Sequence, residues 1–81
     1  MIKLTILQTY QNDFWTSVMV HCKKSRAVIT RNLDGIITVH NYGDPDHNSI
    51  IGGVYKNIDA ALEIYKPLPH ICAMIRTIET V

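Results

Sequence analysis

The sequence predicts an α+β domain in which a mostly antiparallel sheet of four to five strands carries one short helix, in the order β-β-β-β-α-β. Three observations predict this class. Apolar and polar residues alternate along the first half of the chain, a strong turn signal divides that half, and an apolar stripe with helical spacing begins only after residue 56. With 81 residues, the chain is expected to form one small domain, residues 1–81, with a thin core.

Alternation with period two predicts the first two strands. Residues 2–9 place three aliphatic side chains on one face, which is typical of a half-buried strand. After a turn at residues 11–13, residues 14–22 alternate again. One face of this second strand is expected in the core, and it carries Phe14, Thr16, Val18, Val20 and Cys22.

A hairpin is expected to join the third and fourth strands. Residues 23–26 are polar and predict a tight connection, after which the β-branched residues of 27–32 favour a strand. Gly35 ends an Asn-Leu-Asp-Gly turn, where a positive φ suits glycine. Residues 36–40 then return as the fourth strand, and residues 41–53 predict a loop rich in Asn, Gly, Asp, Pro and Ser.

A short helix is predicted at residues 57–66. Asn57 is a good N-cap, and Asp59 in the first turn suits the positive end of the helix dipole. The helix is expected to end before Pro67 and Pro69. Its apolar stripe has i, i+3, i+4, i+7 spacing and consists of Ile58, Ala61, Leu62 and Tyr65.

The C-terminal segment, residues 70–81, is ambiguous. Its apolar residues fit a helix, because they are spaced as Ile71, Met74, Ile75 and Ile78. Half of its residues are nevertheless β-branched, which favours a strand. We expect a closing strand and keep the helix as the alternative.

Composition limits the classes of function. The formal net charge is +1 and 47% of the residues are apolar, which indicates a globular protein rather than a disordered or strongly basic one. The N-terminus has no signal-peptide pattern, and no apolar run approaches the ~20 residues of a membrane span. We therefore expect a cytoplasmic protein with no membrane partner. Cys22 and Cys72 fit two reduced thiols, with a disulfide as the alternative.

The stretch HNYGDPDHNS, residues 40–49, offers two imidazoles and two carboxylates within eight residues: His40, Asp44, Asp46 and His47. It could hold a metal, provide an acid/base histidine, or form a polar loop. The spacing matches no specific zinc signature, and its residue types are common in turns. We expect a solvent-exposed loop with no metal and no cofactor.

The sequence does not indicate catalysis. His21 and Cys22 are neighbours on a strand, so their side chains point to opposite faces and cannot act as a base and a nucleophile. Gly52-Gly53 is not followed by the residues of a phosphate-binding loop. We therefore expect a protein that is not an enzyme.

The charges divide the chain into a basic hairpin at residues 21–31 and an acidic loop and helix. A scattered, solvated surface is the alternative to a binding role. Trp15 either lies on the outer face of the sheet, where tryptophan often anchors a partner, or packs under a loop. The expected partner-binding residues are Trp15, His21, Lys23, Lys24, Arg26, Arg31, Asp44, Asp46, Asp59 and Glu63.

Two segments resemble small phage-encoded proteins that block host enzymes. Phe14-Trp15-Thr16-Ser17-Val18 forms an aromatic-led strand, and residues 55–65 contain a helix of the type Ile-Asp-Ala-Ala-Leu-Glu. A proline break and a β-branched segment with Arg76 follow. This layout resembles the inhibitors of bacterial RNA polymerase and, more loosely, other phage inhibitors, including anti-CRISPR proteins. The resemblance implies a non-catalytic protein that blocks a host enzyme.

The expected function is therefore a small protein-binding module, an inhibitor that blocks a surface of a larger host complex that processes nucleic acid. One alternative is a nucleic-acid-binding regulator that uses the basic hairpin, residues 21–31. A second alternative is a metal- or histidine-dependent enzyme that uses residues 40–49. We expect a monomer or a homodimer.

Overall fold

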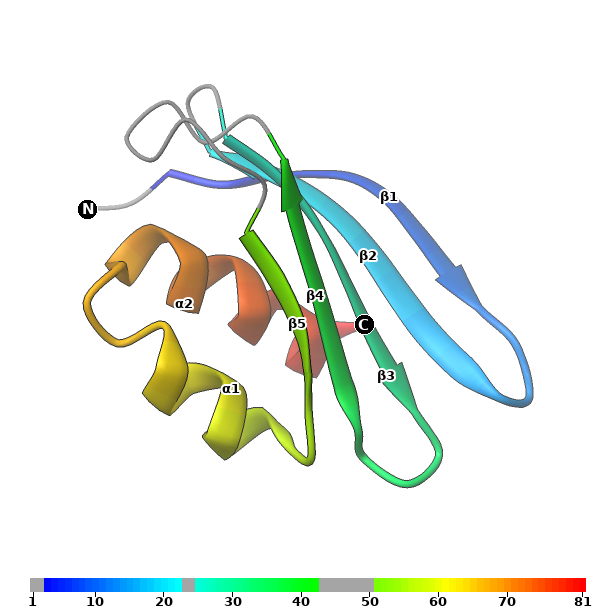
Figure 1. Cartoon of the computed structure of the whole chain (residues 1–81). Coiled ribbons are helices and arrows are strands. Elements are labelled where there is room, and N and C mark those ends of the chain that lie inside the picture. Colours follow the sequence, from blue (N-terminus) through cyan, green and yellow to red (C-terminus); the bar gives the residue numbers. More distant parts are fainter. Residues whose placement is uncertain (1–2, 23–24, 43–50) are drawn as a thin grey trace.

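A five-stranded antiparallel sheet, covered on one face by two helices, forms the α+β fold that the sequence predicts (Figure 1). The computed structural model describes residues 3–22, 25–42 and 51–81. The strands lie side by side in chain order, each antiparallel to the next. They are β1 (Thr5–Gln11), β2 (Trp15–Cys22), β3 (Ser25–Asn32), β4 (Ile37–Tyr42) and β5 (Ile51–Tyr55).

Asparagine side chains organise the β1–β2 and β3–β4 hairpin turns. The Oδ1 atom of Asn12 accepts hydrogen bonds from the amides of Phe14 and Trp15, at 2.7 and 2.9 Å. In the β3–β4 turn, Asn32 Oδ1 accepts from the amides at positions 34 and 36, at 2.9 and 3.0 Å. Gly35 has a φ of 84°, as predicted for this turn, because glycine adopts a positive φ without a steric penalty.

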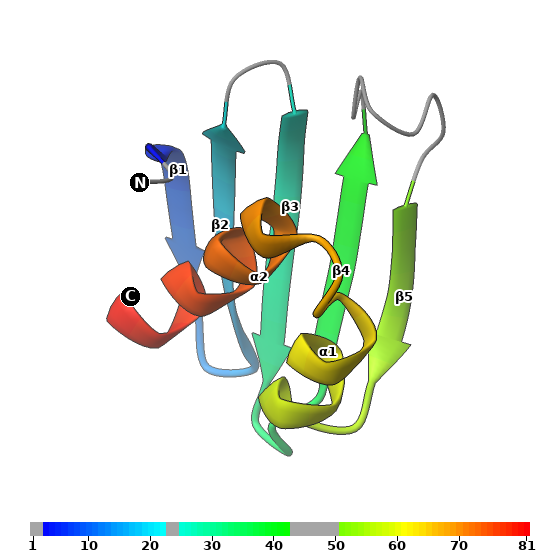
Figure 2. The same ribbon diagram turned by 90° about the vertical axis from the view of Figure 1, so that its left-hand side faces the viewer.

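The helix layer consists of α1 (Ile58–Ile64), α2 (Pro69–Arg76) and the 3-10 helix η1 (Thr77–Thr80). Asn57 caps α1 as predicted, since its Oδ1 accepts from the amide of Ala60 at 2.8 Å. Figure 2 shows α2 lying across β2 and β3, while α1 lies near β4 and β5.

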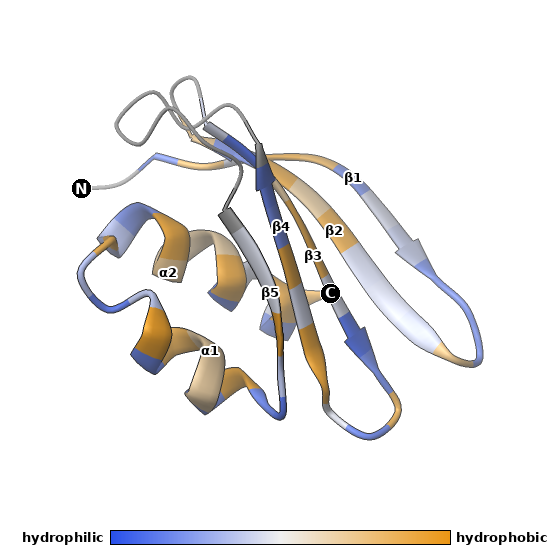
Figure 3. Cartoon of the chain, viewed as in Figure 1, coloured by the Kyte–Doolittle hydropathy of each residue, from blue (hydrophilic) through white to orange (hydrophobic). Residues whose placement is uncertain are grey.

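One core fills the space between the helices and the face of the sheet that they cover, which we call the inner face. Every second residue of β2 and β3 points into it, and most of these side chains are buried. Figure 3 shows apolar residues on both of the layers that meet there. The largest buried apolar side chains are Ile29, Ile37, Val18, Val20 and Val39 from the sheet, and Ile71, Met74, Ile75 and Ile78 from the helices.

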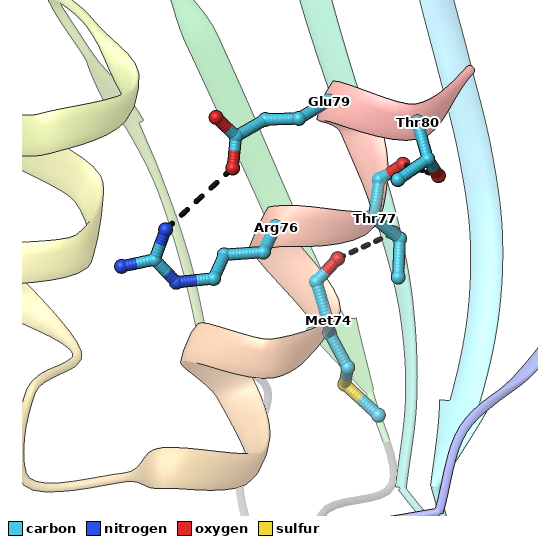
Figure 4. A network of polar contacts seen from close by, with 5 residues as sticks. All are labelled: Met74, Arg76, Thr77, Glu79 and Thr80. Atoms are coloured by element: carbon cyan, nitrogen blue, oxygen red, sulfur yellow. Dashed lines mark hydrogen bonds and ion pairs between the residues drawn. The ribbon is translucent and has the colours of Figure 1, made fainter.

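The expected closing strand at residues 70–81 is wrong, because this segment is α2 followed by η1. Pro69 does not only follow the first helix; it stands in the first turn of the second, where its missing N–H costs nothing. The β-branched side chains are tolerated at the end of the helix. Thr77 Oγ1 donates to the carbonyl of Met74 at 2.6 Å, and Thr80 Oγ1 donates to the carbonyl of Thr77 at 2.8 Å (Figure 4).

The fifth strand comes from the segment that was expected to be a loop, residues 41–53. The expected fourth strand, residues 36–40, continues to Tyr42, and β5 begins at Ile51. Asn41, one of the expected loop residues, is fully buried in the inner face, where its Nδ2 donates to Ser25 Oγ at 2.8 Å. Residues 43–50, which include most of the HNYGDPDHNS stretch, lie outside the described residues.

The first strand is not half-buried as expected, because all seven residues of β1 are exposed. β1 is at an edge of the sheet, and its register against β2 shifts between Ile6 and Gln8. Phe14 was expected in the core but is 65% exposed in the β1–β2 turn. The covered part of the sheet therefore begins at β2.

Candidate functional site

No described element covers the second face of the sheet, which we call the outer face (Figure 1). Its residues alternate with the buried ones along each strand, so the register fixes which side chains stand next to each other. The outer face carries Gln8 and Tyr10 of β1, Trp15, Ser17, Met19 and His21 of β2, Arg26, Val28, Thr30 and Asn32 of β3, Thr38 and His40 of β4, and Val54 of β5.

One end of the outer face is basic. His21 lies directly opposite Arg26, and His40 lies opposite Val28 in the next row. Arg26 and His40 are exposed, while His21 is partly buried. We call His21, Arg26 and His40 the basic end.

The other end is aromatic. Tyr10 and Trp15 are 53% and 42% exposed, and their ring centroids lie 6.2 Å apart with the planes tilted by 35°. Large rings that remain this open to solvent supply much apolar contact area to a partner at a small cost in side-chain entropy. We call Tyr10 and Trp15 the aromatic end.

The surface between the two ends is partly apolar and slightly hollow. Met19 lies opposite Val28, and both are partly buried. A hollow of about 170 Å³ lies over this region, lined by residues of β1, β2 and β3 that include these two. The hydroxyls of Ser17 and Thr30 hydrogen-bond across the strands at 3.0 Å, so they form a fixed polar row beside the hollow.

The outer face bears no carboxylate, because the five strands contain no aspartate or glutamate. Asp13 and Asp34 belong to the two turns beside the aromatic end, and both are exposed. The remaining described acidic residues, Asp59, Glu63 and Glu79, belong to the helix layer. The charges thus differ between the two layers of the fold.

The predicted basic hairpin does not form one surface. His21, Arg26 and Trp15 all lie on the outer face. Arg31 lies in a row with Thr16 and Ile37, whose side chains belong to the inner face, so it points away from Arg26. Lys23, Lys24, Asp44 and Asp46 lie outside the described residues.

The two described members of the predicted acidic set, Asp59 and Glu63, lie together on α1. They stand four residues apart and line an open groove of about 620 Å³ between α1 and α2. The floor of this groove is apolar, with Leu62 and Ala73, and the basic side chain of Arg76 faces it from α2. Asp59 and Glu63 therefore lie in the opposite layer from His21 and Arg26.

The described part of the chain contains no group of three or more His, Cys, Asp or Glu side chains that could hold a metal. Cys22 is buried in the inner face and His21 belongs to the outer face, as their adjacent positions predict. The other thiol, Cys72, donates hydrogen bonds to the carbonyls of Tyr65 and Leu62, at 3.1 and 3.6 Å. Burial raises the pKa of Cys72, although the positive charge of Arg76 acts to lower it. The reactive thiolate is therefore disfavoured.

The predicted set did not include several outer-face residues, among them Tyr10, Met19, Val28 and His40. The sequence pattern contained a signal for Met19 and Val28. Continuing the alternation Trp15, Ser17, Met19, His21 into the next strand predicts that Arg26 and Val28 share a face. The neighbours from β1 and β4 depend on the strand order, which one sequence does not provide.

Among the described residues, the helices are all too short or too polar to cross a membrane. Comparisons of the chain with models of protein families, with characterised proteins and with solved structures find no match.

Proposed function

We propose that this protein is a small, non-catalytic protein-binding module that acts by occupying a surface of a larger protein with its outer face. The observation that supports this most is the composition of that face. Tyrosine, tryptophan, methionine and arginine are the residue types enriched in protein interfaces, and Tyr10, Trp15, Met19 and Arg26 all lie there. The aromatic end would supply the anchor.

The area of the outer face limits how much of a stable interface it can form by itself. The seven residues of β2 from Trp15 to His21 span about 20 Å, and five strands are about 20 Å wide. This gives roughly 400 Å², whereas a stable interface takes about 800 Å² from each partner. The partner therefore also reaches the exposed β1 edge or the β1–β2 turn, where Leu7 and Phe14 are exposed.

The resemblance to phage inhibitors indicates which class of partner protein to expect. It favours a host complex that processes nucleic acid, because the inhibitors with this layout block such enzymes. The protein would act by steric exclusion, which needs no catalytic group and no cofactor.

A second candidate function is direct binding of single-stranded nucleic acid to the same face. The aromatic end favours it, since bases stack on exposed rings, and so does the absence of carboxylates from the strands. Among the outer-face residues that the structure describes, Arg26 is the one arginine and there is no lysine, so they offer little counterion release to stabilise such a complex.

Site-specific photocrosslinking in host lysate tests the proposal. Benzoylphenylalanine replaces Thr38 on the outer face or, as the matched control, the exposed Ile64 on α1. We expect a protein adduct from position 38 that resists nuclease and disappears in the Trp15→Ala variant. A nucleic-acid adduct would favour the second candidate function. An adduct from position 64 alone would place the interface on the helix layer and contradict the proposal.

A further inference from the structure

The distribution of charge around the outer face is asymmetric along the strands. The basic end lies at one extreme, with His21 opposite Arg26 and the exposed His40 in the neighbouring row. Asp13 and Asp34 lie in the turns at the other extreme, next to the aromatic end. A charged partner that crosses the face therefore meets opposite potentials at its two ends.

This asymmetry determines which partner chemistry fits. Carboxylates of a partner are attracted to the basic end, where Arg26 can form charge-assisted hydrogen bonds, and no carboxylate of the strands repels them. The same carboxylates would be repelled by Asp13 and Asp34 at the aromatic end. Apolar side chains fit there instead, against the exposed rings of Tyr10 and Trp15.

We infer that the outer face binds an acidic segment of a partner protein in one orientation, with carboxylates at the basic end and apolar side chains at the aromatic end. This inference rests on the proposed function, because it specifies the partner of the same face. The ends are about 20 Å apart along β2, so an extended segment of about six residues spans them.

The test uses synthetic peptides and the ¹⁵N-labelled full chain, with binding followed by NMR chemical shifts. The acidic peptide carries a run of aspartates at one end and two large apolar residues at the other, and it is made in both chain directions. In the control peptide every aspartate is replaced by asparagine. Oligothymidylate serves as the nucleic-acid probe.

We expect the acidic peptide to shift the signals of the outer face, and the control peptide to bind about tenfold more weakly at low salt. Arg26→Glu should weaken binding of the acidic peptide by about the same factor, and the loss should shrink as salt screens the charges. Arg76→Glu is the matched control, since this arginine is exposed on the helix layer, and it should bind as the wild type does.

Equal binding of the acidic and control peptides would overturn the inference, and so would the absence of binding by either. Tighter binding of oligothymidylate to the same signals would overturn it in favour of nucleic acid. Failure of the inference can be distinguished from failure of the proposed function. If position 38 still crosslinks to a protein in a Trp15-dependent manner while Arg26→Glu has no effect, the binding module stands and its partner segment is not acidic.

Discussion

At the scale of single residues, two tyrosines connect the sheet to the helix layer. Tyr55 of β5 donates its hydroxyl hydrogen bond to Tyr65 Oη at 2.8 Å, and the rings meet edge to face with centroids 5.6 Å apart. Gly53 makes room for this contact, because a Cβ at that position would lie 2.5 Å from Tyr55 Oη. Burial of the phenol raises the pKa of Tyr65 above its ordinary value.

This raised pKa predicts how stability depends on pH. In the unfolded chain the phenol of Tyr65 ionises near pH 10, whereas in the folded protein it stays neutral to higher pH. The unfolded state therefore releases a proton first, and the free energy of unfolding should fall as pH rises above 10. Tyr65→Phe loses about 1 kcal/mol at pH 7 but lacks this fall, so urea denaturation should show a constant difference up to about pH 10 and convergence of the two proteins by about pH 11.

Tyr10→Phe is the control for this comparison, since Tyr10 is exposed on the outer face. It should follow the wild-type dependence on pH. A difference between wild type and Tyr65→Phe that stays constant up to pH 11 would contradict the prediction.

At the scale of elements, the N-cap of α1 determines how firmly a seven-residue helix is held. Asn57 Oδ1 accepts from the Ala60 amide, which has no partner within the helix. Asn57→Ala should lower the free energy of unfolding by about 1 kcal/mol in urea denaturation. Asn57→Asp keeps an acceptor and should remain close to wild type. Equal losses in both variants would mean that the cap hydrogen bond does not stabilise α1.

The sequence predicted some elements correctly because their signals are local. The cap at Asn57 and the turn at Gly35 depend on a few neighbouring residues, and both predictions are confirmed. The C-terminal segment was predicted wrongly because two local signals disagreed. Its helical spacing, seen in the buried Ile71, Met74 and Ile78, matched the core that the sheet offers and outweighed the β-branched composition.

The fifth strand was missed for a different reason. Gly52 and Gly53 indicate a loop in one sequence, yet both positions need glycine because of close approach. A Cβ at Gly52 would lie 2.8 Å from the carbonyl oxygen of Val39 on β4, and one at Gly53 would meet the Tyr55 ring. The first contact involves a neighbouring strand, and the second depends on the rotamer of Tyr55 in the folded protein. No local sequence pattern therefore reveals them.

At the scale of the whole molecule, the fold has a core on one side only. Alternation within β2 correctly predicted that Thr16, Val18, Val20 and Cys22 face it. Of the two alternatives left open for Trp15, the structure shows the outer face. The basic hairpin was predicted as one surface because its residues were grouped by position in the chain. Arg26 and Arg31 are an odd number of residues apart on one strand, so they point to opposite faces.

The one-sided core predicts a sharp difference between two large apolar side chains. Ile71 of α2 is fully buried against the sheet, whereas Met19 lies on the outer face that no described element covers. Ile71→Ala should lower the free energy of unfolding by about 2–5 kcal/mol, because the cavity it leaves cannot fill. Met19→Ala should cost roughly 1 kcal/mol or less, since it opens no enclosed cavity.

Urea and thermal unfolding of the two variants measure this difference. If Ile71→Ala does not fold, Ile71→Val removes a single methylene group from the same site and should cost about 0.5–1.5 kcal/mol. A loss for Met19→Ala as large as the loss for Ile71→Ala would mean that the outer face is covered in solution. In that case the apparent stability of the wild type should be measured at several protein concentrations, because only a second copy makes it depend on concentration.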